Sequence, residues 1–360
     1  MRVVAHNGAR ILGGAERATV LLLSGLKSRG HDVLLMCNDE LVARYSEAAG
    51  VPSKIAIIGG DLSVFYARDF ARSLAAEKPD AVIIGTWKKL FFASWAAKKS
   101  GARKVVARVG LESDTPRSFK YRYALRRWTD AVVVNANRMA EPFIDLEGFD
   151  PRHVTVIHNG VSTPERRSPP GELRRELGIP PDALVAGTVA RLVSQKRIDR
   201  MLRAFALLSP DAHLIIAGDG DERETLILIA KSLGISDRVH FLGHRENKGD
   251  VLDALDVFVI TSDREGMSNA MLEAMSFGLP VVSTPVSGAL EAVMPYNDND
   301  AAGLMARFDE ASVARSIDGL FRDSEMRISM GEKARTIART QFSIDSMLDK
   351  WEEVLRAPRG

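Results

Sequence analysis

The chain of 360 residues has a single cysteine, Cys37, which excludes an internal disulfide and a zinc site built from cysteines. No apolar run approaches the roughly 18–20 residues that a membrane-spanning helix needs. The N-terminus begins with a short strand-like run and has no secretory signal. Hydrophobic residues reach 46%, enough for two sizeable cores at roughly 150 residues per domain. We therefore expect a two-domain protein in a reducing, cytoplasmic setting.

The formal net charge of +2 hides an uneven distribution of charge along the chain. Residues 1–165 hold 24 Lys and Arg against 17 Asp and Glu, whereas the remainder holds 25 against 30. Within the first half, the stretch Lys88–Trp128 has twelve basic residues, and Glu112 and Asp114 are its only acids. Such a bias is typical of a face that meets an anionic partner.

Short runs rich in Val, Ile and Leu alternate with helix-like stretches along the whole chain. Most of these runs are continuously apolar, as expected for parallel strands that are covered on both faces. The predicted strands are residues 3–5, 33–36, 55–58, 82–84, 105–109, 132–134, 154–157, 185–189, 214–217, 239–242, 257–261 and 281–283. The alternation predicts an α/β fold with two doubly wound parallel sheets that face a central cleft.

The boundary between the two domains is predicted from Ser162–Asp182, which has five prolines and no sustained periodicity. A hinge there would let the cleft close. The last helix carries an apolar stripe and follows the second sheet, so it is expected to pack across the domains. The expected divisions are an N-terminal domain at 1–163, a hinge linker at 164–182, a C-terminal domain at 183–340 and the last helix at 341–360.

A glycine pair follows the first predicted strand. Gly13, Gly14 and Glu16 precede an amphipathic run at residues 18–26. Paired glycines before a helix let backbone amides approach an anion or a sugar closely, and the alternative is a tight turn between strand and helix. The Gly-x-Gly-x-x-Gly pattern is absent, which disfavours a nicotinamide-dependent oxidoreductase.

Two cations follow the first predicted strand of the second half. Arg191 and Lys196 lie just past the carboxyl end of strand 185–189. The planar fork of an arginine and the compact charge of a lysine are suited to hold a diphosphate. Solvated surface charge is the alternative interpretation.

The most informative stretch is residues 262–280. Ser268 is predicted to cap a short helix at its N-terminus, and Gly278 to end it. Glu265 precedes this helix and Glu273 lies inside it. Two carboxylates near a helix N-terminus can accept hydrogen bonds from the vicinal hydroxyls of a ribose and a hexose, and a capped helix with surface glutamates is the alternative.

The pattern Glu265-x7-Glu273, followed by Gly278-x-Pro280-Val-Val, resembles the signature of glycosyltransferase family 4. The members of this family, also described as glycosyl transferases group 1, are retaining GT-B enzymes with two Rossmann-like domains. The resemblance spans nearly the whole chain. Further matching positions are Gly13, Gly14, Glu16, His158, Asn159, Gly160, Val161, Arg191, Lys196, Gly218, Gly220, Gly288 and Glu291.

The resemblance implies roles for individual residues. Arg191 and Lys196 would neutralise the departing diphosphate of the donor, and Glu265 would hold hydroxyls of the transferred sugar, so these three are the expected catalytic residues. Glu273 would bind the ribose. The implied donor-binding residues are Gly14, Arg191, Lys196, Gly243, His244, Arg245, Glu265, Met267, Ser268, Asn269, Ala270 and Glu273. The implied acceptor-binding residues are Gly13, Gly14, Glu16 and Arg108.

The resemblance implies no metal ion and no other cofactor, since cationic side chains and a helix end act on the phosphates. Two Asp-x-Asp patterns, at 219–221 and 298–300, are interpreted as a turn and a loop. Many relatives carry a histidine after the strand equivalent to 105–109, where this chain has Gly110. Arg108 and Glu112 are the candidates to replace it.

The sequence thus predicts a retaining, metal-independent hexosyltransferase that uses a UDP- or GDP-linked sugar. The acceptor would be a glycan or a lipid-linked saccharide, as in polysaccharide biosynthesis. The alternative on the same fold is a nucleotide-sugar 2-epimerase, which would share the diphosphate site and lack an acceptor. A non-catalytic binding protein would leave the charged set around Glu265 unexplained.

The basic stretch Lys88–Trp128 interleaves cations with aromatic residues, which suits an anionic membrane surface. We expect a peripheral location at the inner face of the membrane. Nucleic acid is not an expected partner, because no recognised nucleic-acid motif accompanies the charge.

Overall fold

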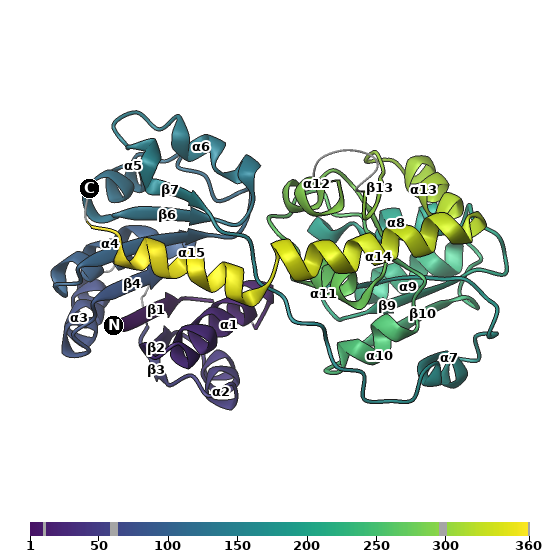
Figure 1. Cartoon of the computed structure of the whole chain (residues 1–360), viewed down its shortest axis with the longest axis horizontal. Coiled ribbons are helices and arrows are strands. Elements are labelled where there is room, and N and C mark those ends of the chain that lie inside the picture. The colour runs from purple at the N-terminus through teal and green to yellow at the C-terminus, as the bar shows by residue number, and fades with distance from the viewer. Residues whose placement is uncertain (10–11, 58–63, 295–300, 359–360) are drawn as a thin grey trace. The chain divides into compact units, whose positions relative to one another are not determined.

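The computed structural model describes residues 1–9, 12–57, 64–294 and 301–358 (Figure 1). It forms two compact units. Unit 1 comprises Met1–Gly160 and Ile344–Gly360, and unit 2 comprises Val161–Ser343. The chain therefore leaves unit 1 after residue 160 and returns to it at residue 344, so that unit 2 is inserted before the last helix of unit 1.

Unit 1 alternates strands and helices. Its strands are β1 (Arg2–Asn7), β2 (Asp32–Cys37), β3 (Ser53–Ile55), β4 (Ala81–Ile84), β5 (Lys104–Val109), β6 (Ala131–Val134) and β7 (Val154–Val156). Its helices are α1 (Gly14–Ser28), α2 (Glu40–Ala48), α3 (Val64–Ala76), α4 (Leu90–Lys99), α5 (Phe119–Trp128), α6 (Glu141–Ile144) and α15 (Ile344–Arg356), with 3-10 turns η1 (Trp87–Lys89), η2 (Asn137–Met139) and η3 (Pro151–His153).

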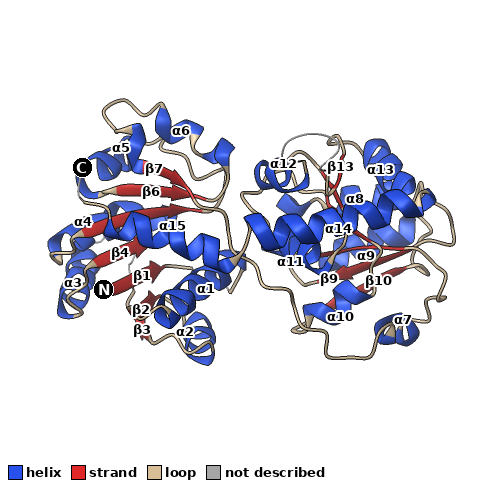
Figure 2. Ribbon diagram, viewed as in Figure 1, coloured by secondary structure: helices blue, strands red, loops and turns tan. Residues whose placement is uncertain are grey.

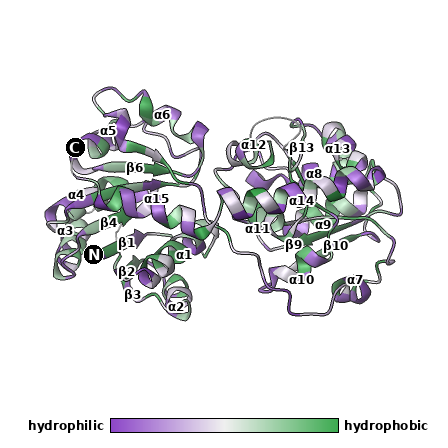
Figure 3. Cartoon of the chain, in the orientation of Figure 1, coloured by the Kyte–Doolittle hydropathy of each residue, from purple (hydrophilic) through white to green (hydrophobic). Residues whose placement is uncertain are grey.

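The sheet of unit 1 is parallel throughout, in the order β3-β2-β1-β4-β5-β6-β7. The strand order reverses between β1 and β4, where the segments after both strands reach the same edge. Both faces are covered by helices (Figure 2). One core lies under α3, α4 and α5, and the other lies under α1, α2 and α15. The strands are mostly apolar, as Figure 3 shows, because successive side chains point to opposite faces of the sheet and both faces are covered by a core. The edge strand β3 is the exception, since Lys54 and Ile55 are exposed.

Unit 2 repeats this organisation. Its strands are β8 (Val185–Val189), β9 (His213–Ala217), β10 (Val239–Gly243), β11 (Val257–Ile260), β12 (Val281–Ser283) and β13 (Gly303–Met305). Its helices are α7 (Glu172–Glu176), α8 (Ile198–Phe205), α9 (Arg223–Ser232), α10 (Lys248–Asp253), α11 (Asn269–Phe277), α12 (Ser287–Val293), α13 (Glu310–Arg322) and α14 (Ser324–Gln341), with the 3-10 turn η4 (Ser194–Lys196).

The sheet of unit 2 is also parallel, in the order β10-β9-β8-β11-β12-β13. Its strand order reverses between β8 and β11, the position at which doubly wound sheets bind ligands beyond the carboxyl ends of the strands. Helices α7, α10, α11, α12 and α14 contribute to one core, and α8, α9 and α13 contribute to the other. The predicted doubly wound fold class is confirmed.

The strand predictions agree with the structure except at two places. Strand β3 covers Ser53–Ile55, earlier than the predicted 55–58, of which residue 58 lies outside the described residues. Strand β13 was not predicted, since its three residues give too short an apolar run. None of the described helices is both long and apolar enough to cross a membrane.

The segment at 164–182, expected as a hinge, lies within unit 2 and is anchored to α10. The carboxylate of Asp250 accepts hydrogen bonds from the backbone N–H groups of Arg167 (2.8 Å) and Ser168 (2.9 Å). A Cβ on Gly249 would lie only 2.0 Å from the carbonyl oxygen of Glu165. This part of the segment is therefore held against the unit rather than free in solvent.

Candidate functional site

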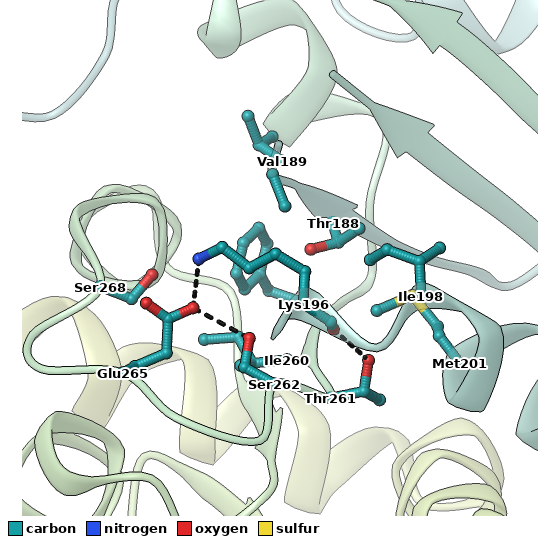
Figure 4. Close-up of a pocket in the computed structure, with 12 residues that line it drawn as sticks. Thr188, Val189, Lys196, Ile198, Met201, Ile260, Thr261, Ser262, Glu265 and Ser268 are labelled. Atoms are coloured by element: carbon teal, nitrogen blue, oxygen red, sulfur yellow. Dashed lines mark hydrogen bonds and ion pairs between the residues drawn. The ribbon is translucent and has the colours of Figure 1, made fainter. Parts of the chain in front are cut away.

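The main candidate site lies in unit 2, where β8 and β11 diverge (Figure 4). The turn after β8 carries Lys196 at the end of η4, and the loop after β11 carries Glu265. Their side chains point toward each other and form an ion pair. Topology thus brings together two predicted catalytic residues that are 69 positions apart in the sequence.

Glu265 is buried, with 8% of its surface exposed. Its Oε1 atom contacts Lys196 and also accepts a hydrogen bond of 2.9 Å from the Ser262 hydroxyl. A buried carboxylate needs such partners, because leaving its charge unsatisfied costs several kcal/mol. Sequence reasoning did not single out Ser262, which fixes the orientation of the carboxylate from within the same loop.

The cavity beside this pair is small. Its volume is about 10 Å³, which is close to the space that one water molecule needs. A diphosphate is much larger than a water molecule. The cavity by itself therefore has no room for a diphosphate.

The turn that carries Lys196 is held in an unusual backbone conformation. Arg197 has φ 49° and ψ 45°, a left-handed conformation that costs a residue with a side chain roughly 1–2 kcal/mol. Its guanidinium contacts the carboxylates of Asp199 at 3.0 Å and Asp263 at 3.2 Å. The Thr261 hydroxyl donates to the Arg197 carbonyl oxygen at 2.9 Å. These contacts fix the direction in which Lys196 leaves the turn.

Arg200 joins the same network from helix α8. It is buried, and its Nη atoms donate to the Thr261 carbonyl oxygen and to Asp263, each at 2.8 Å. Burial acts to raise the pKa of Asp263, but hydrogen bonds from Arg200 and Arg197 outweigh it and hold that pKa below its ordinary value. Since Asp263 stays ionised, it joins the Lys196 turn to the Glu265 loop.

Arg191 lies in the turn directly after β8, and its position depends on two glycines. A Cβ on Gly218 would lie 1.8 Å from the Ala190 carbonyl oxygen, and a Cβ on Gly220 would lie 2.4 Å from that of Leu192. These glycines let the turn after β9 press on the turn that carries Arg191. The Arg191 side chain is exposed and makes no ion pair with any described residue, so it can reach an anion.

Helix α11 begins and ends as the sequence predicts. Ser268 is its N-cap and accepts from the Met271 N–H at 3.4 Å, and Gly278 ends it at φ 95°. The predicted donor-binding residues Asn269 and Ala270 form its half-buried first turn, and Met267 is buried just before it.

The predicted ribose-binding residue Glu273 lies within α11. Both of its carboxylate oxygens are 2.7 Å from Nζ of Lys248, at the start of α10. A carboxylate offers about four acceptor positions, so ribose hydroxyls can still donate to Glu273. Sequence reasoning missed Lys248, because nothing in the local pattern around it indicates a partner 25 residues away.

Gly243 is the last residue of β10, and His244 and Arg245 follow it at the same edge of the sheet. Gly243 has φ +66°, and its carbonyl oxygen accepts from the Gly218 N–H at 2.7 Å. The side chains of His244 and Arg245 are exposed. The structure therefore places the predicted base-binding segment next to the glycine turn that supports Arg191.

The predicted acceptor residues of unit 1 gather around the start of α1. Oε2 of Glu16 accepts from the Gly13 N–H at 2.8 Å, and its Oε1 accepts from the Asn7 amide at 3.3 Å. Gly13 is thus the N-cap of α1, and the buried Glu16 side chain satisfies its backbone N–H. Gly14 is the first residue of α1.

Arg108 at the end of β5 is directed at this turn. It donates to the Thr19 hydroxyl at 2.8 Å and to the Asn159 side chain at 3.4 Å. Desolvation lowers the pKa of Arg108 to about 10, against the attraction of Glu16, so the guanidinium is still charged at neutral pH. At Gly110, near the position where a histidine is expected from the resemblance, a Cβ would meet nothing within 4 Å among the described residues.

Only the first of the two Asp-x-Asp patterns lies within the described residues. Asp219 accepts from the Gly220 N–H at 2.8 Å and belongs to the turn after β9. The pattern at 298–300 lies outside the described residues. Across residues 1–9, 12–57, 64–294 and 301–358, no group of three His, Cys, Asp or Glu side chains is placed to hold a metal ion.

Comparison with known proteins decides the family. The model of the family "Glycosyl transferases group 1" matches residues 171–337, and that of "Glycosyltransferase Family 4" matches residues 12–165. The chain is 32% identical over 291 residues to the lipopolysaccharide core biosynthesis glycosyltransferase LpsE of Rhizobium meliloti (strain 1021). The aligned region covers 78% of this chain and 76% of LpsE. The chain belongs to the group 1 glycosyltransferases.

Other relatives of this glycosyltransferase are matched over shorter lengths. It is 35% identical over 222 residues to a D-inositol 3-phosphate glycosyltransferase of Stackebrandtia nassauensis, which is 57% of this chain and about half (49%) of that protein. Its fold matches the crystal structure of Anabaena Alr3699/HepE in complex with UDP and glucose, with a TM-score of 0.87, 22% identity and 99% of each chain covered. The predicted GT-B fold is confirmed.

These findings make the protein a hexosyl-transferring enzyme, as predicted. They do not favour the 2-epimerase alternative. The roles given above to individual site residues stay predictions.

Proposed function

We propose that this glycosyltransferase is a retaining, metal-independent enzyme that transfers a hexosyl group from a UDP- or GDP-linked donor to a glycan or lipid-linked saccharide. The observation that carries the proposal is the Lys196–Glu265 pair, which lies where the strand order of the sheet reverses between β8 and β11. A carboxylate for sugar hydroxyls and a cation for phosphate lie there in direct contact. The Anabaena structure of the same fold is a complex with UDP and glucose, which supports a UDP-linked donor.

The proposed reaction uses the charges of unit 2 at the leaving group. As the bond from the anomeric carbon to the phosphate oxygen breaks, negative charge grows on the diphosphate. Lys196, the exposed Arg191 and the N-terminus of α11 stabilise that charge. Because these groups are positive and close to the phosphates, we propose that the chain needs no metal ion.

The anomeric configuration is retained if the acceptor hydroxyl attacks the anomeric carbon from the same face from which the diphosphate departs. The acceptor hydroxyl forms the new glycosidic bond there, and its proton passes to the departing phosphate oxygen. This step balances without a nucleophile on the protein. Glu265 would orient the sugar by accepting hydrogen bonds from its hydroxyls, and Ser262 would keep the carboxylate in place.

The acceptor class rests on two observations. The R. meliloti relative is named for lipopolysaccharide core biosynthesis, and a lipopolysaccharide is a saccharide linked to a lipid. Unit 1 also has a basic surface with exposed aromatic residues: Phe119 is 80% and Tyr123 is 42% exposed on α5. Cations beside such residues favour peripheral binding to the inner, anionic face of a membrane, which fits a cytoplasmic enzyme.

The donor site is tested by thermal stabilisation. A ligand that binds only the folded state must raise the melting temperature. We expect that either UDP or GDP raises the melting temperature, and that the nucleotide sugar with the same base does so as well. Each ligand should raise the melting temperature by the same amount with and without EDTA. No shift with either nucleotide at millimolar concentration would contradict the donor site, and a shift lost in EDTA would contradict metal independence.

The stereochemistry and the class of the reaction are tested by identifying the reaction products. When the nucleotide sugar is incubated with the enzyme and no acceptor, it should not be converted into a different nucleotide sugar. Such a conversion would indicate an epimerase. With a saccharide acceptor, proton NMR should show the anomeric configuration of the donor in the product. An inverted product would refute retention.

Membrane binding is tested by charge neutralisation on η1 and α4. Lys98 is unsuitable, because it pairs with Asp130 at 2.6 Å and its loss would disturb the fold. The exposed Lys88 and Lys99 are suitable. Lys88→Gln with Lys99→Gln should reduce sedimentation with anionic vesicles, and the exposed control pair Lys231→Gln with Lys350→Gln should not. Equal sedimentation of both variants would refute this surface.

A further inference from the structure

A second cavity lies in unit 1, outside the donor site and outside the glycine turn of α1. It has a volume of about 290 Å³, near the lower end of the range for small-molecule pockets. Three arginines line it: Arg117 in the loop before α5, and Arg122 and Arg126 on α5. Nothing in the proposed reaction uses this cavity.

Two of these arginines are fixed by the backbone around them. Arg122 and Arg126 are four residues apart, which puts both on the same face of α5. Nε of Arg122 donates to the Pro116 carbonyl oxygen at 3.0 Å. This bond leaves the terminal Nη groups of Arg122 as further donors.

Arg126 is positioned by a glycine in the segment that follows α6. At Gly148 a Cβ would lie 3.3 Å from Nε and 3.4 Å from Cζ of Arg126, so the guanidinium lies against bare backbone. Gly148 also has φ +71°, which favours glycine. This glycine after α6 therefore leaves the space that the Arg126 side chain occupies.

The charges in the cavity are not balanced by ion pairs. None of the three arginines has a carboxylate oxygen within 4.0 Å among the described residues, although Asp145 and Glu147 also line the cavity. Elsewhere in unit 1 arginines pair closely, as Arg29 does with Asp349 at 2.5 Å. All three side chains are exposed, so they can meet an anion that arrives from solvent, and a bound anion would place opposite charge between them.

We propose that this cavity is a phosphate-binding site in which Arg122 and Arg126 donate to the phosphate oxygens and Arg117 adds charge at its edge. Guanidinium forks match the geometry of phosphate, and the volume leaves room for a glycerol-sized or sugar-sized group beside it. The phosphate belongs either to a soluble phosphate monoester or to the headgroup of an anionic phospholipid. This site does not depend on the donor site.

The first test uses isothermal titration of the full chain with sn-glycerol 3-phosphate. Arg126→Gln should weaken binding at least tenfold, as the loss of a charged hydrogen bond predicts. The matched control is Arg127→Gln, the exposed neighbour that does not line the cavity, and it should bind as the wild type does. Lys196→Ala should also bind normally, which separates this site from the donor site.

The second arm uses vesicles of phosphatidylcholine with phosphatidylglycerol. Vesicle binding that falls with Arg126→Gln and not with Arg127→Gln, without binding of the soluble monoester, would assign the phosphate to a lipid headgroup. Equal behaviour of the two variants in both arms would overturn the proposal. If Arg126→Gln fails to fold by circular dichroism, Arg117→Gln replaces it, because Arg117 lies in the loop before α5 and not on the helix.

Discussion

Acidification should destabilise unit 1 through one buried histidine at the end of β1. His6 is 1% exposed, and its ring lies against the edge of Phe70 with centroids 4.9 Å apart. Burial lowers the pKa of His6 from its ordinary 6.5 to about 4, Lys89 acts in the same direction, and the Asn38 side chain opposes both. The folded protein therefore holds this ring neutral at a pH where the unfolded chain protonates it.

The sign and size of the effect follow from proton linkage. Between pH 6.5 and 4 the unfolded state binds more protons at this position than the folded state does, so stability falls as the pH falls. With these two pKa values, the loss between pH 7.5 and pH 5 is about 2 kcal/mol. For a unit of this size that corresponds to a fall in melting temperature of about 4–8 °C.

The assay uses the natural distribution of tryptophan. All four tryptophans, Trp87, Trp95, Trp128 and Trp351, belong to unit 1, so tryptophan fluorescence reports the melting of that unit. The variant His6→Leu cannot take up the proton and keeps an apolar contact with Phe70. Between pH 7.5 and pH 5, the wild type should lose about 4–8 °C more than His6→Leu does.

Comparing the two proteins removes the other groups that titrate in this range. Burial raises the pKa of Asp114 to about 6, and burial lowers the pKa values of His213 and His240, but these groups are common to both proteins. If the melting temperatures of the wild type and His6→Leu fall by the same amount, the folded state does not lower the pKa of His6. A histidine NMR titration would then give its pKa directly.

Three further predictions follow from contacts described above. Lys196→Ala should lower turnover on the order of 100-fold, because it removes a charge that stabilises the leaving diphosphate; normal turnover in a steady-state assay would exclude that role. Glu273→Ala should weaken nucleotide binding in isothermal titration, whereas unchanged affinity would contradict the ribose assignment. Leu348→Ala should destabilise unit 1 by about 3 kcal/mol, since Leu348 is 2% exposed and contacts the Gly25 position of α1, and an unchanged fluorescence melting curve would show that α15 is not part of that core.

The sequence was most informative where a local pattern fixes local structure. Of the thirteen strands among the described residues, the apolar runs located eleven and overlapped β3 at one residue. Ser268 and Gly278 marked the ends of α11, because capping depends on residues a few positions apart. The carboxyl ends of those strands then indicated where Lys196 and Glu265 would meet. That step needed only the rule for doubly wound sheets.

Contacts between distant segments could not be predicted in this way. Nothing near Lys248 in the sequence indicates its pairing with Glu273, and nothing near Asp263 indicates that it binds Arg197 and Arg200. Proline content predicted a hinge at 164–182, but it gave no sign that carboxylates on α10 bind part of that segment. Such pairings depend on which side chains the tertiary fold brings together.

The return of α15 to unit 1 has a consequence for the order in which the protein folds on the ribosome. The apolar side chains of α15, including the buried Leu348 and Trp351, complete a core whose other residues are made more than 180 residues earlier. Unit 2 is continuous in sequence, so all of it is synthesised before α15 exists. During translation the first unit to emerge is therefore the last to be completed, and until then its β-sheet carries an uncovered apolar surface that a chaperone could bind.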